Sequence, residues 1–197
     1  MPADNSDLEG KLSIREEALL TVGGGQLAQV LDCYAGEGHM YRQVWHKADR
    51  YLGLEKRFAR PAGHTDGECW RGDNARMLDR ALRRAPWNIV DLDAYGSPWQ
   101  LFRRVARAAK SPKITVTMTC GLQRNLCGGM VTPWVRAVTG ANGLSYTGLL
   151  VRWYDDVVRW TIEHCLKGTG FKVARARRRL SRRNKDTWYW LVELARE

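Results

Sequence analysis

Short strand-like runs alternate with helix-like runs through the middle of this chain, and this alternation limits the folds open to it. The strand-like runs are 29–34, 51–55, 68–71, 88–93 and 113–119, and the helix-like runs are 39–48, 74–84 and 98–110. A helix between two consecutive strands favours their parallel pairing. The pattern therefore predicts an α/β fold in which a mostly parallel sheet carries helices on both faces.

The last part of the chain follows a different pattern. Residues 149–166 are helix-like, and the strand-like runs 171–179 and 187–194 are joined by a short polar turn. Because so short a connection joins only antiparallel neighbours, we expect a mostly parallel sheet of seven strands that closes with an antiparallel hairpin. We expect residues 1–20 to form a tail and a short helix, with Ser13 and Glu16 as a capping box. A single domain would then span 21–197.

The charge of the chain indicates a class of partner. Lys and Arg number 32 against 21 Asp and Glu, which gives a net charge of +11 and a sequence pI near 9.8. A field of this sign favours a polyanion such as nucleic acid, although it can also serve solubility alone. The densest cluster lies in the terminal hairpin, where we predict nucleic-acid contacts at Arg175, Arg177, Arg179, Arg182 and Arg183.

Composition also argues against several kinds of site. No run reaches the ~18 apolar residues of a membrane helix, and the polar start of the chain does not resemble a signal peptide. The five cysteines are widely spaced, no Cys-x-x-Cys motif is present, and the four histidines are scattered. We therefore expect a cytoplasmic protein with no membrane partner and no metal site.

The residues that follow each strand are the candidates for chemistry, because ligands of open parallel sheets bind at the carboxyl ends of the strands. Asp32 precedes a loop with Gly36 and Gly38, which allow a close approach of backbone to ligand. The loop has neither a dinucleotide fingerprint nor a phosphate-binding lysine, so its acidic groups suit a cationic or phosphate-free nucleoside. Glu55 is placed to take ribose hydroxyls. Asp73 could accept from an adenine amino group or cap a helix.

Four motifs together resemble the class I S-adenosylmethionine-dependent methyltransferases. They are VLDCYAGEG (30–38), YLGLEK (51–56), RGDNA (71–75) and DLDAYGSP (91–98), and they occur in the order of that family. The resemblance implies a Rossmann-like fold. It also implies S-adenosylmethionine as cofactor, with the glycine loop near its methionine end, Glu55 on its ribose and Asp73 near its adenine. The cofactor-binding residues so predicted are Asp32, Ala35, Gly36, Gly38, Glu55, Asp73 and Asn74.

The fourth motif is most similar to the catalytic loop of the tRNA guanosine-N2 dimethyltransferases, although Ala94 stands where that family has proline. The resemblance implies that Asp93 faces the exocyclic amine of a guanine. A carboxylate there can localise the lone pair of the amine and accept its proton. Tyr95 is the second catalytic candidate and would stack on the base, unless it only packs. Asp91 is expected to be structural and, as a near neighbour, to raise the pKa of Asp93.

The sequence thus predicts a methyltransferase of EC 2.1.1 type that acts on an RNA base amine, with a role in tRNA processing. The alternatives are a DNA amino-methyltransferase, a cytosine-C5 enzyme that uses Cys120, a small-molecule methyltransferase, and a non-catalytic nucleic-acid-binding module. RNA is favoured over DNA as the partner. Residues 121–150 could form a substrate lid or a surface loop, and the sequence leaves the oligomeric state open.

Overall fold

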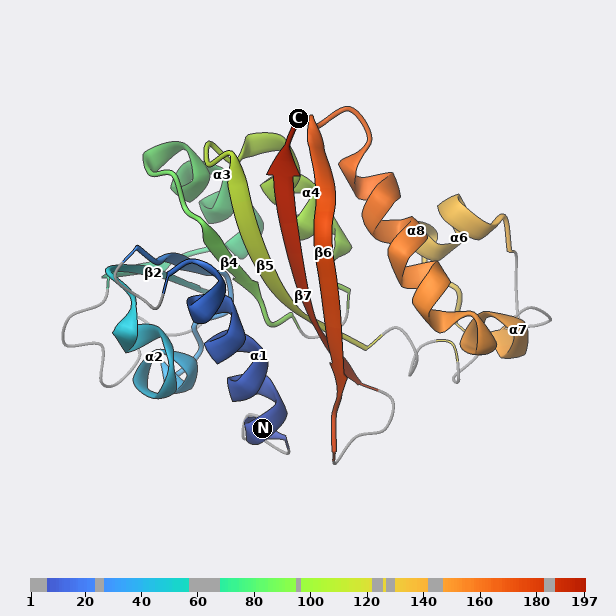
Figure 1. Ribbon diagram of the computed structural model, residues 1–197, viewed down its shortest axis with the longest axis horizontal. Helices are drawn as coiled ribbons and strands as arrows, with labels where there is room; N and C mark the ends of the chain where they lie inside the picture. Colours follow the sequence, from blue (N-terminus) through green and yellow to red (C-terminus); the bar gives the residue numbers. More distant parts are fainter. Residues whose placement is uncertain are drawn as a thin grey trace.

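The computed structural model describes residues 7–23, 27–56, 68–94, 97–121, 126, 130–141, 147–182 and 187–197. Figure 1 shows one central sheet with helices around it. The strands are β1 (Gln29–Asp32), β2 (Arg50–Glu55), β3 (Glu68–Arg71), β4 (Ile89–Leu92), β5 (Lys113–Cys120), β6 (Phe171–Leu180) and β7 (Trp188–Arg196). The helices are α1 (Leu8–Thr21), α2 (His39–Gln43), the 3₁₀ turn η1 (Trp45–Lys47), α3 (Asn74–Arg84), α4 (Trp99–Ala108), α6 (Pro133–Thr139), α7 (Thr147–Arg152) and α8 (Tyr154–Leu166).

The seven strands form a single sheet in the order β3-β2-β1-β4-β5-β7-β6. The first five strands of the chain pair in parallel, whereas β7 is antiparallel to both β5 and β6. The predicted α/β class, the mostly parallel sheet and the closing hairpin are therefore confirmed. The strand order reverses between β1 and β4, which is the point where ligands bind in sheets of this kind.

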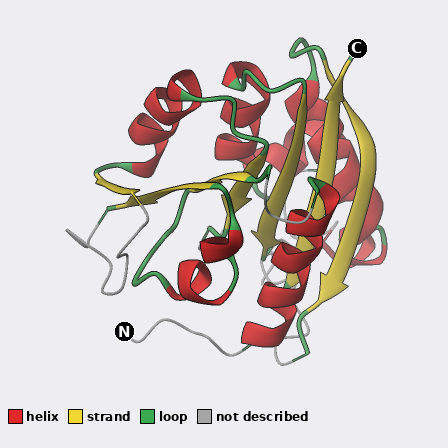
Figure 2. Ribbon diagram, turned by 60° about the vertical axis from the view of Figure 1, so that its left-hand side comes forward, coloured by secondary structure: helices red, strands yellow, loops and turns green. Residues whose placement is uncertain are grey.

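Helices cover both faces of the sheet (Figure 2). On one face, α3, α4 and α8 bury residues such as Leu78, Phe102 and Val158 against the inward side chains of the strands. On the other face, α1, α2 and η1 contribute Ile14, Met40 and Trp45 to a second core. The apolar residues of the parallel strands therefore face packed helices on both sides, which explains why these strands are near-continuous apolar runs.

The start of α1 differs from the prediction. The helix begins at Leu8, and the carboxylate of Asp7 caps it by accepting the backbone N–H of Gly10 at 3.2 Å. The predicted capping box of Ser13 and Glu16 is therefore wrong, since both residues lie inside a helix that has already begun. The earlier cap extends α1 by more than a turn, and this added length brings Lys11 to the carboxyl edge of the sheet.

Three other helical segments also differ from the pattern. The run 39–48 is divided into α2 and η1, and the run 149–166 is divided into α7 and α8 at Trp153. Helix α6 lies in the segment for which the sequence predicted no element. Thr132 caps it, Pro133 occupies its first turn and Gly140 ends it at a φ of 69°.

Candidate functional site at the carboxyl edge of the sheet

The predicted site residues converge where the parallel strands end. Asp32 ends β1 and pairs in register with Gly53 of β2 and Asp91 of β4. The loop after β1 is anchored to both neighbours, since Cys33 N–H donates to the Asp91 carbonyl at 2.9 Å and Ala35 N–H donates to the Leu54 carbonyl at 3.1 Å. The switch point of the sheet thus carries the glycine loop at its carboxyl edge.

The glycines of this loop are required by its geometry. Gly36 and Gly38 have φ values of 52° and 79°, in the left-handed region that other residues rarely adopt. Gly53 allows the loop to pack on β2, because a Cβ there would lie 2.8 Å from the Cβ of Ala35. The loop can therefore lie directly on the ends of β1 and β2.

Glu55 connects this loop to the end of β2. Its side chain is 9% exposed, and its Oε2 accepts the backbone N–H of Gly36 at 3.0 Å. The predicted ribose-binding carboxylate is thus held beside the predicted glycine loop. Its position is set by a hydrogen bond to the loop itself.

Asp73 and Asn74 follow β3 at the same edge. Asp73 caps α3 by accepting the backbone N–H of Arg76 at 3.1 Å, so the capping role considered for it is present in the structure. The amide nitrogen of Asn74 donates to the Cys33 carbonyl at 2.7 Å, whereas its Oδ1 is buried and has no hydrogen-bond partner among the described atoms. A buried acceptor without a partner is unfavourable, and a donor on a bound nucleoside would satisfy it.

Asp32 is almost completely buried and is held in place by two donors. The backbone N–H of Tyr34 and the hydroxyl of Tyr51 donate to its carboxylate at 3.0 and 3.1 Å. Burial, and then the neighbouring charge of Asp91, raise the pKa of the Asp32 carboxyl to about 8. A cationic ligand group near this loop would favour the ionised form of Asp32.

Asp91 makes a buried ion pair with Arg15 of α1. Arg15 is 1% exposed, and its Nε and Nη2 donate to the two carboxylate oxygens at 2.6 and 2.9 Å. Trp45 Nε1 and Thr117 Oγ1 donate to the same carboxylate at 3.1 and 2.9 Å. With its lone pairs so occupied, Asp91 has the structural role that its position within the strand predicted.

Asp93 is the first residue after the end of β4, and its side chain is 15% exposed. Lys11 Nζ contacts its Oδ2 at 2.9 Å, Arg15 Nη2 contacts the same oxygen at 3.3 Å, and Thr119 donates to Oδ1 at 2.5 Å. Burial favours a higher pKa for the Asp93 carboxyl, but Arg15, Lys11 and the hydrogen bond from Thr119 lower it to about 2. The expectation that Asp91 raises this pKa is therefore wrong, because Arg15 lies between the two carboxylates and contacts both.

Sequence reasoning did not find Lys11 and Arg15, which belong to a helix that it placed outside the domain. The only signal was their spacing of four positions, which puts both side chains on one face of a helix.

Cys120, the candidate of the C5 alternative, is 1% exposed in the core beneath α4 and α8, and adjacent strand positions point to opposite faces. Its thiol is therefore across the sheet from Thr119 and Asp93, which disfavours the C5 alternative.

Comparison with known proteins relates this geometry to a fold. No family model matches the sequence, and no curated protein matches it in sequence. Solved structures do match. TYW2 from M. jannaschii in complex with AdoMet has a TM-score of 0.54 at 10% identity and covers 96% of this chain and 77% of its own. The O-methyltransferase TomG from Streptomyces achromogenes in complex with SAM has a TM-score of 0.59 at 17% identity, and the match covers 96% of this chain and 80% of TomG. The cyclopropane synthase MmaA2 from Mycobacterium tuberculosis has a TM-score of 0.53 at 14% identity, and the match covers 96% of this chain and 85% of MmaA2.

The chain has the class I methyltransferase fold. In this methyltransferase fold, the residues predicted to bind cofactor gather at one edge, around the ends of β1, β2 and β3, with Asp93 beyond the end of β4. Tyr95, the second catalytic candidate, lies outside the described residues. Within the described ranges, no group of three or more His, Cys, Asp or Glu side chains could hold a metal ion, and no helix is long and apolar enough to cross a bilayer.

Of the residues predicted to contact nucleic acid, Arg175, Arg177 and Arg179 lie on the edge strand β6, and Arg182 lies just after it. Three of them already have acidic partners: Arg175 contacts Glu193 at 3.5 Å, Arg177 contacts Glu17 at 2.5 Å and Arg182 contacts Glu9 at 2.7 Å. Arg179 is exposed and has no ion pair with a described carboxylate, and Arg183 lies outside the described residues. A phosphate at this strand would have to compete with these carboxylates, and the nucleic-acid contact stays a prediction.

Proposed function

We propose that this protein is an S-adenosylmethionine-dependent methyltransferase that methylates an exocyclic amine of an RNA base, as at guanosine N2. The observation that carries the proposal is the position of Asp93. It lies beyond the carboxyl end of β4, at the same sheet edge as the glycine loop, and it is partly exposed while Lys11 and Thr119 hold it. An acceptor atom between this carboxylate and the loop would meet a methyl donor bound there.

The residues at this edge of the sheet fit the proposed cofactor. Asp32 offers a carboxylate to a cationic end, Glu55 can accept from ribose hydroxyls, and the unpartnered Oδ1 of Asn74 can accept from a donor on the base. S-adenosylmethionine, when bound, supplies a methyl group on a positively charged sulfur. The absence of a phosphate-binding motif also agrees with a nucleoside that carries no phosphate.

Asp93 would then orient the amine and accept its proton. Because its pKa is about 2, the carboxyl is ionised at neutral pH and can accept a hydrogen bond from the amine N–H. A carboxylate of such low pKa is a weak base. It suffices if the proton leaves only as the N–C bond forms, since the nitrogen then carries positive charge. Lys11 and Arg15 keep the carboxylate oriented, and positioning supplies much of the rate in such transfers.

The choice of an RNA substrate rests on charge and on the resemblance of the Asp93 loop. A net charge of +11 favours a polyanion over a small neutral molecule. The test is transfer of a tritiated methyl group to total tRNA, rRNA and DNA, followed by nucleoside analysis. Label in a methylated guanosine amine of RNA is the expected result.

Other outcomes of this test would assign a different function. Label in an amine of DNA would assign the DNA alternative. Calorimetry with S-adenosylmethionine checks the cofactor separately: no binding heat, together with retained RNA affinity, would identify a non-catalytic binding module. Substrate affinity that does not depend on salt would favour a small-molecule acceptor.

A further inference from the structure

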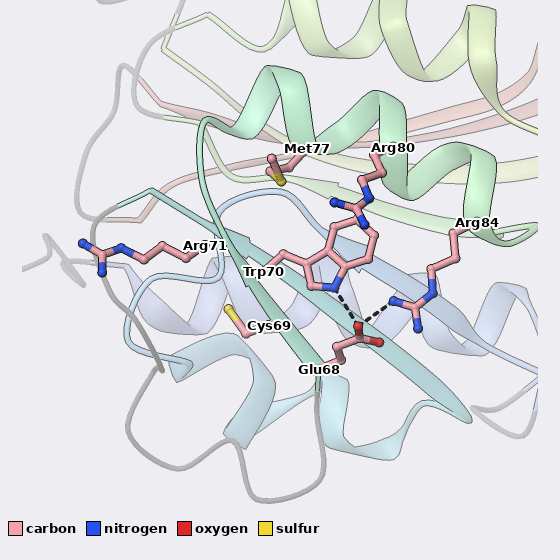
Figure 3. A pocket seen from close by; sticks show the side chains of 7 residues that line it. All are labelled: Glu68, Cys69, Trp70, Arg71, Met77, Arg80 and Arg84. Atoms are coloured by element: carbon pink, nitrogen blue, oxygen red, sulfur yellow. Dashed lines mark hydrogen bonds and ion pairs between the residues drawn. The ribbon is translucent and has the colours of Figure 1, made fainter.

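A groove beside the edge strand β3, on the side of the sheet opposite β6, carries arginines that have few acidic partners. It lies between the edge strand β3 and helix α3, and Figure 3 shows Trp70 at its centre with Arg80 and Arg84 extending toward the indole from α3. The guanidinium carbons of Arg80 and Arg84 lie 5.1 and 5.3 Å from the indole centroid. Met77 and Arg71 also line the groove.

The indole is fixed in one orientation. Trp70 Nε1 donates to Glu68 at 2.6 Å, and the same carboxylate oxygen accepts from Arg84 at 2.5 Å. Trp70 therefore carries a cation on its ring and a carboxylate at its edge, and little rotational freedom remains to be lost on binding. A flat, pre-oriented stack of this kind suits a nucleobase, because bases stack both on aromatic rings and on arginine planes.

The charge balance of this end of the molecule differs from that of β6. Five exposed arginines lie on β3 and α3: Arg71, Arg76, Arg80, Arg83 and Arg84. In the part of the chain that the structure describes, Arg84 alone among these five has a carboxylate partner, Glu68. On β6 and just after it, by contrast, three of the predicted arginines are paired with carboxylates. The positive field is therefore less compensated along β3 and α3, and a polyanion is the complementary partner.

We propose that the groove between β3 and α3 binds a single-stranded RNA segment, with one base extending the Trp70–Arg80 stack and flanking phosphates at Arg71 and the arginines of α3. The proposal rests on the RNA substrate of the proposed function. It adds a contact outside the carboxyl-edge site. A single strand is required because the bases of a duplex already stack on one another and cannot join the indole. An acidic peptide would match the charge and would make no use of the stack.

The test measures RNA binding without methyl transfer. The probe is a fluorescein-labelled single-stranded oligoribonucleotide of about 12 nucleotides, within the ~4–16 nucleotides that such sites cover. Its anisotropy is followed between about 50 and 200 mM salt. The variant Arg71→Ala/Arg80→Ala should lower the log–log salt slope by about 1.4, since each lost contact to a single strand contributes ~0.7.

The matched control is Arg152→Ala/Arg159→Ala. These arginines are also exposed, and in the described residues neither has an ion pair, but they lie on α7 and α8, at the β6 end of the sheet (Figure 1). Both double variants lose the same charge, so an effect that depends on place appears only in the first. An equal fall in slope for the two variants would overturn the proposal, because it would show a general charge effect.

The stack is tested separately. Trp70→Leu should weaken binding roughly 5- to 140-fold, the range that base stacking of ~1–3 kcal/mol per base implies, and Trp70→Phe should recover most of this loss. Thermal unfolding checks that both variants are folded. Unchanged affinity in folded Trp70→Leu, or equally tight binding of polyglutamate, would contradict a base-stacking site.

Calorimetry with S-adenosylmethionine separates this proposal from the proposed function. Normal cofactor binding in all groove variants is expected, since Trp70, Arg71 and Arg80 are not among the residues predicted to bind the cofactor. Loss of RNA binding with intact cofactor binding supports the groove. A wild-type protein that binds cofactor but no single-stranded RNA would overturn the groove and leave the methyltransferase assignment intact.

Discussion

Replacement of Asp93 by asparagine is the most direct test of the catalytic role proposed for it. Asp93→Asn keeps the size of the side chain and one oxygen that can still accept from Thr119, but it removes the charge that pairs with Lys11 and Arg15. If Asp93 accepts the proton of the amine, methyl transfer should fall by ~10²–10⁴-fold, the scale of a lost general base. Cofactor affinity should change little, because the hydrogen bonds and ion pairs of Asp93 with described residues go to Lys11, Arg15 and Thr119 and not to the glycine loop.

The same substitution has a stability effect that the structure allows us to size. A pKa lowered from 3.8 to about 2 corresponds to roughly 2 kcal/mol of preference for the ionised form in the folded protein. That stability is present above about pH 4 and is lost as the pH falls toward 2. Asp93→Asn should therefore be less stable than wild type at neutral pH, and the difference should shrink in acid. Urea unfolding at several pH values measures it.

Two further variants, Asp91→Asn and Cys120→Ser, serve as controls for this experiment. Asp91→Asn should lower stability more than rate, because it breaks the buried pair with Arg15. Cys120→Ser should leave transfer near normal, since the thiol lies in the core on the other side of the sheet. Near-normal transfer in Asp93→Asn with no transfer in Cys120→Ser would refute the amine mechanism and indicate chemistry at a pyrimidine C5.

The other predictions concern the supports of the site. Arg15→Met should lower the free energy of unfolding by about 3–5 kcal/mol, because it leaves a buried carboxylate unpaired, whereas the exposed Arg177→Met should change it by no more than ~1 kcal/mol; similar urea midpoints for the two would contradict this. Glu55→Ala should weaken S-adenosylmethionine binding by roughly 1.5–3 kcal/mol, and unchanged calorimetric affinity would remove Glu55 from the site. Burial raises the pKa of Asp32 to about 8, so wild-type stability should decline as the pH rises from about 4 through 8, and Asp32→Asn should flatten this decline in unfolding experiments. Charge reversal at Arg182 should lower the RNA salt slope by ~0.7–0.9 and leave cofactor binding intact; an unchanged slope would show that this arginine only pairs with α1.

The fold was predictable because its main signals are local. An apolar run followed by a helix-like run specifies a parallel unit wherever it occurs, and the short polar turn near residue 183 allows only an antiparallel hairpin. The ends of the strands could be located for the same reason. Asp32, Glu55, Asp73 and Asp93 were therefore identified as neighbours at one edge before any contact between them was known.

The start of α1 and the break at Trp153 were harder to predict from the sequence. Asp7 caps α1 ahead of the Ser13 that resembled a cap. Several residues of a chain commonly have capping potential. Which of them is used depends on what the following helix buries, and that depends on the sheet beneath it.

The electrostatics of the site depend on contacts that no local pattern encodes. Arg15 is separated by 76 positions from Asp91, and Lys11 by 82 from Asp93. In the sequence, Asp91 is a neighbouring like charge that should raise the pKa of Asp93. In the structure, α1 packs against β5 and β7 and brings the buried guanidinium of Arg15 into contact with both carboxylates, so the pKa of Asp93 falls instead. The sequence determines which residue types stand at a strand end. Their charge states depend on the helix that packs over them, because an ion pair in a low-dielectric interior requires the fold to bring both partners there.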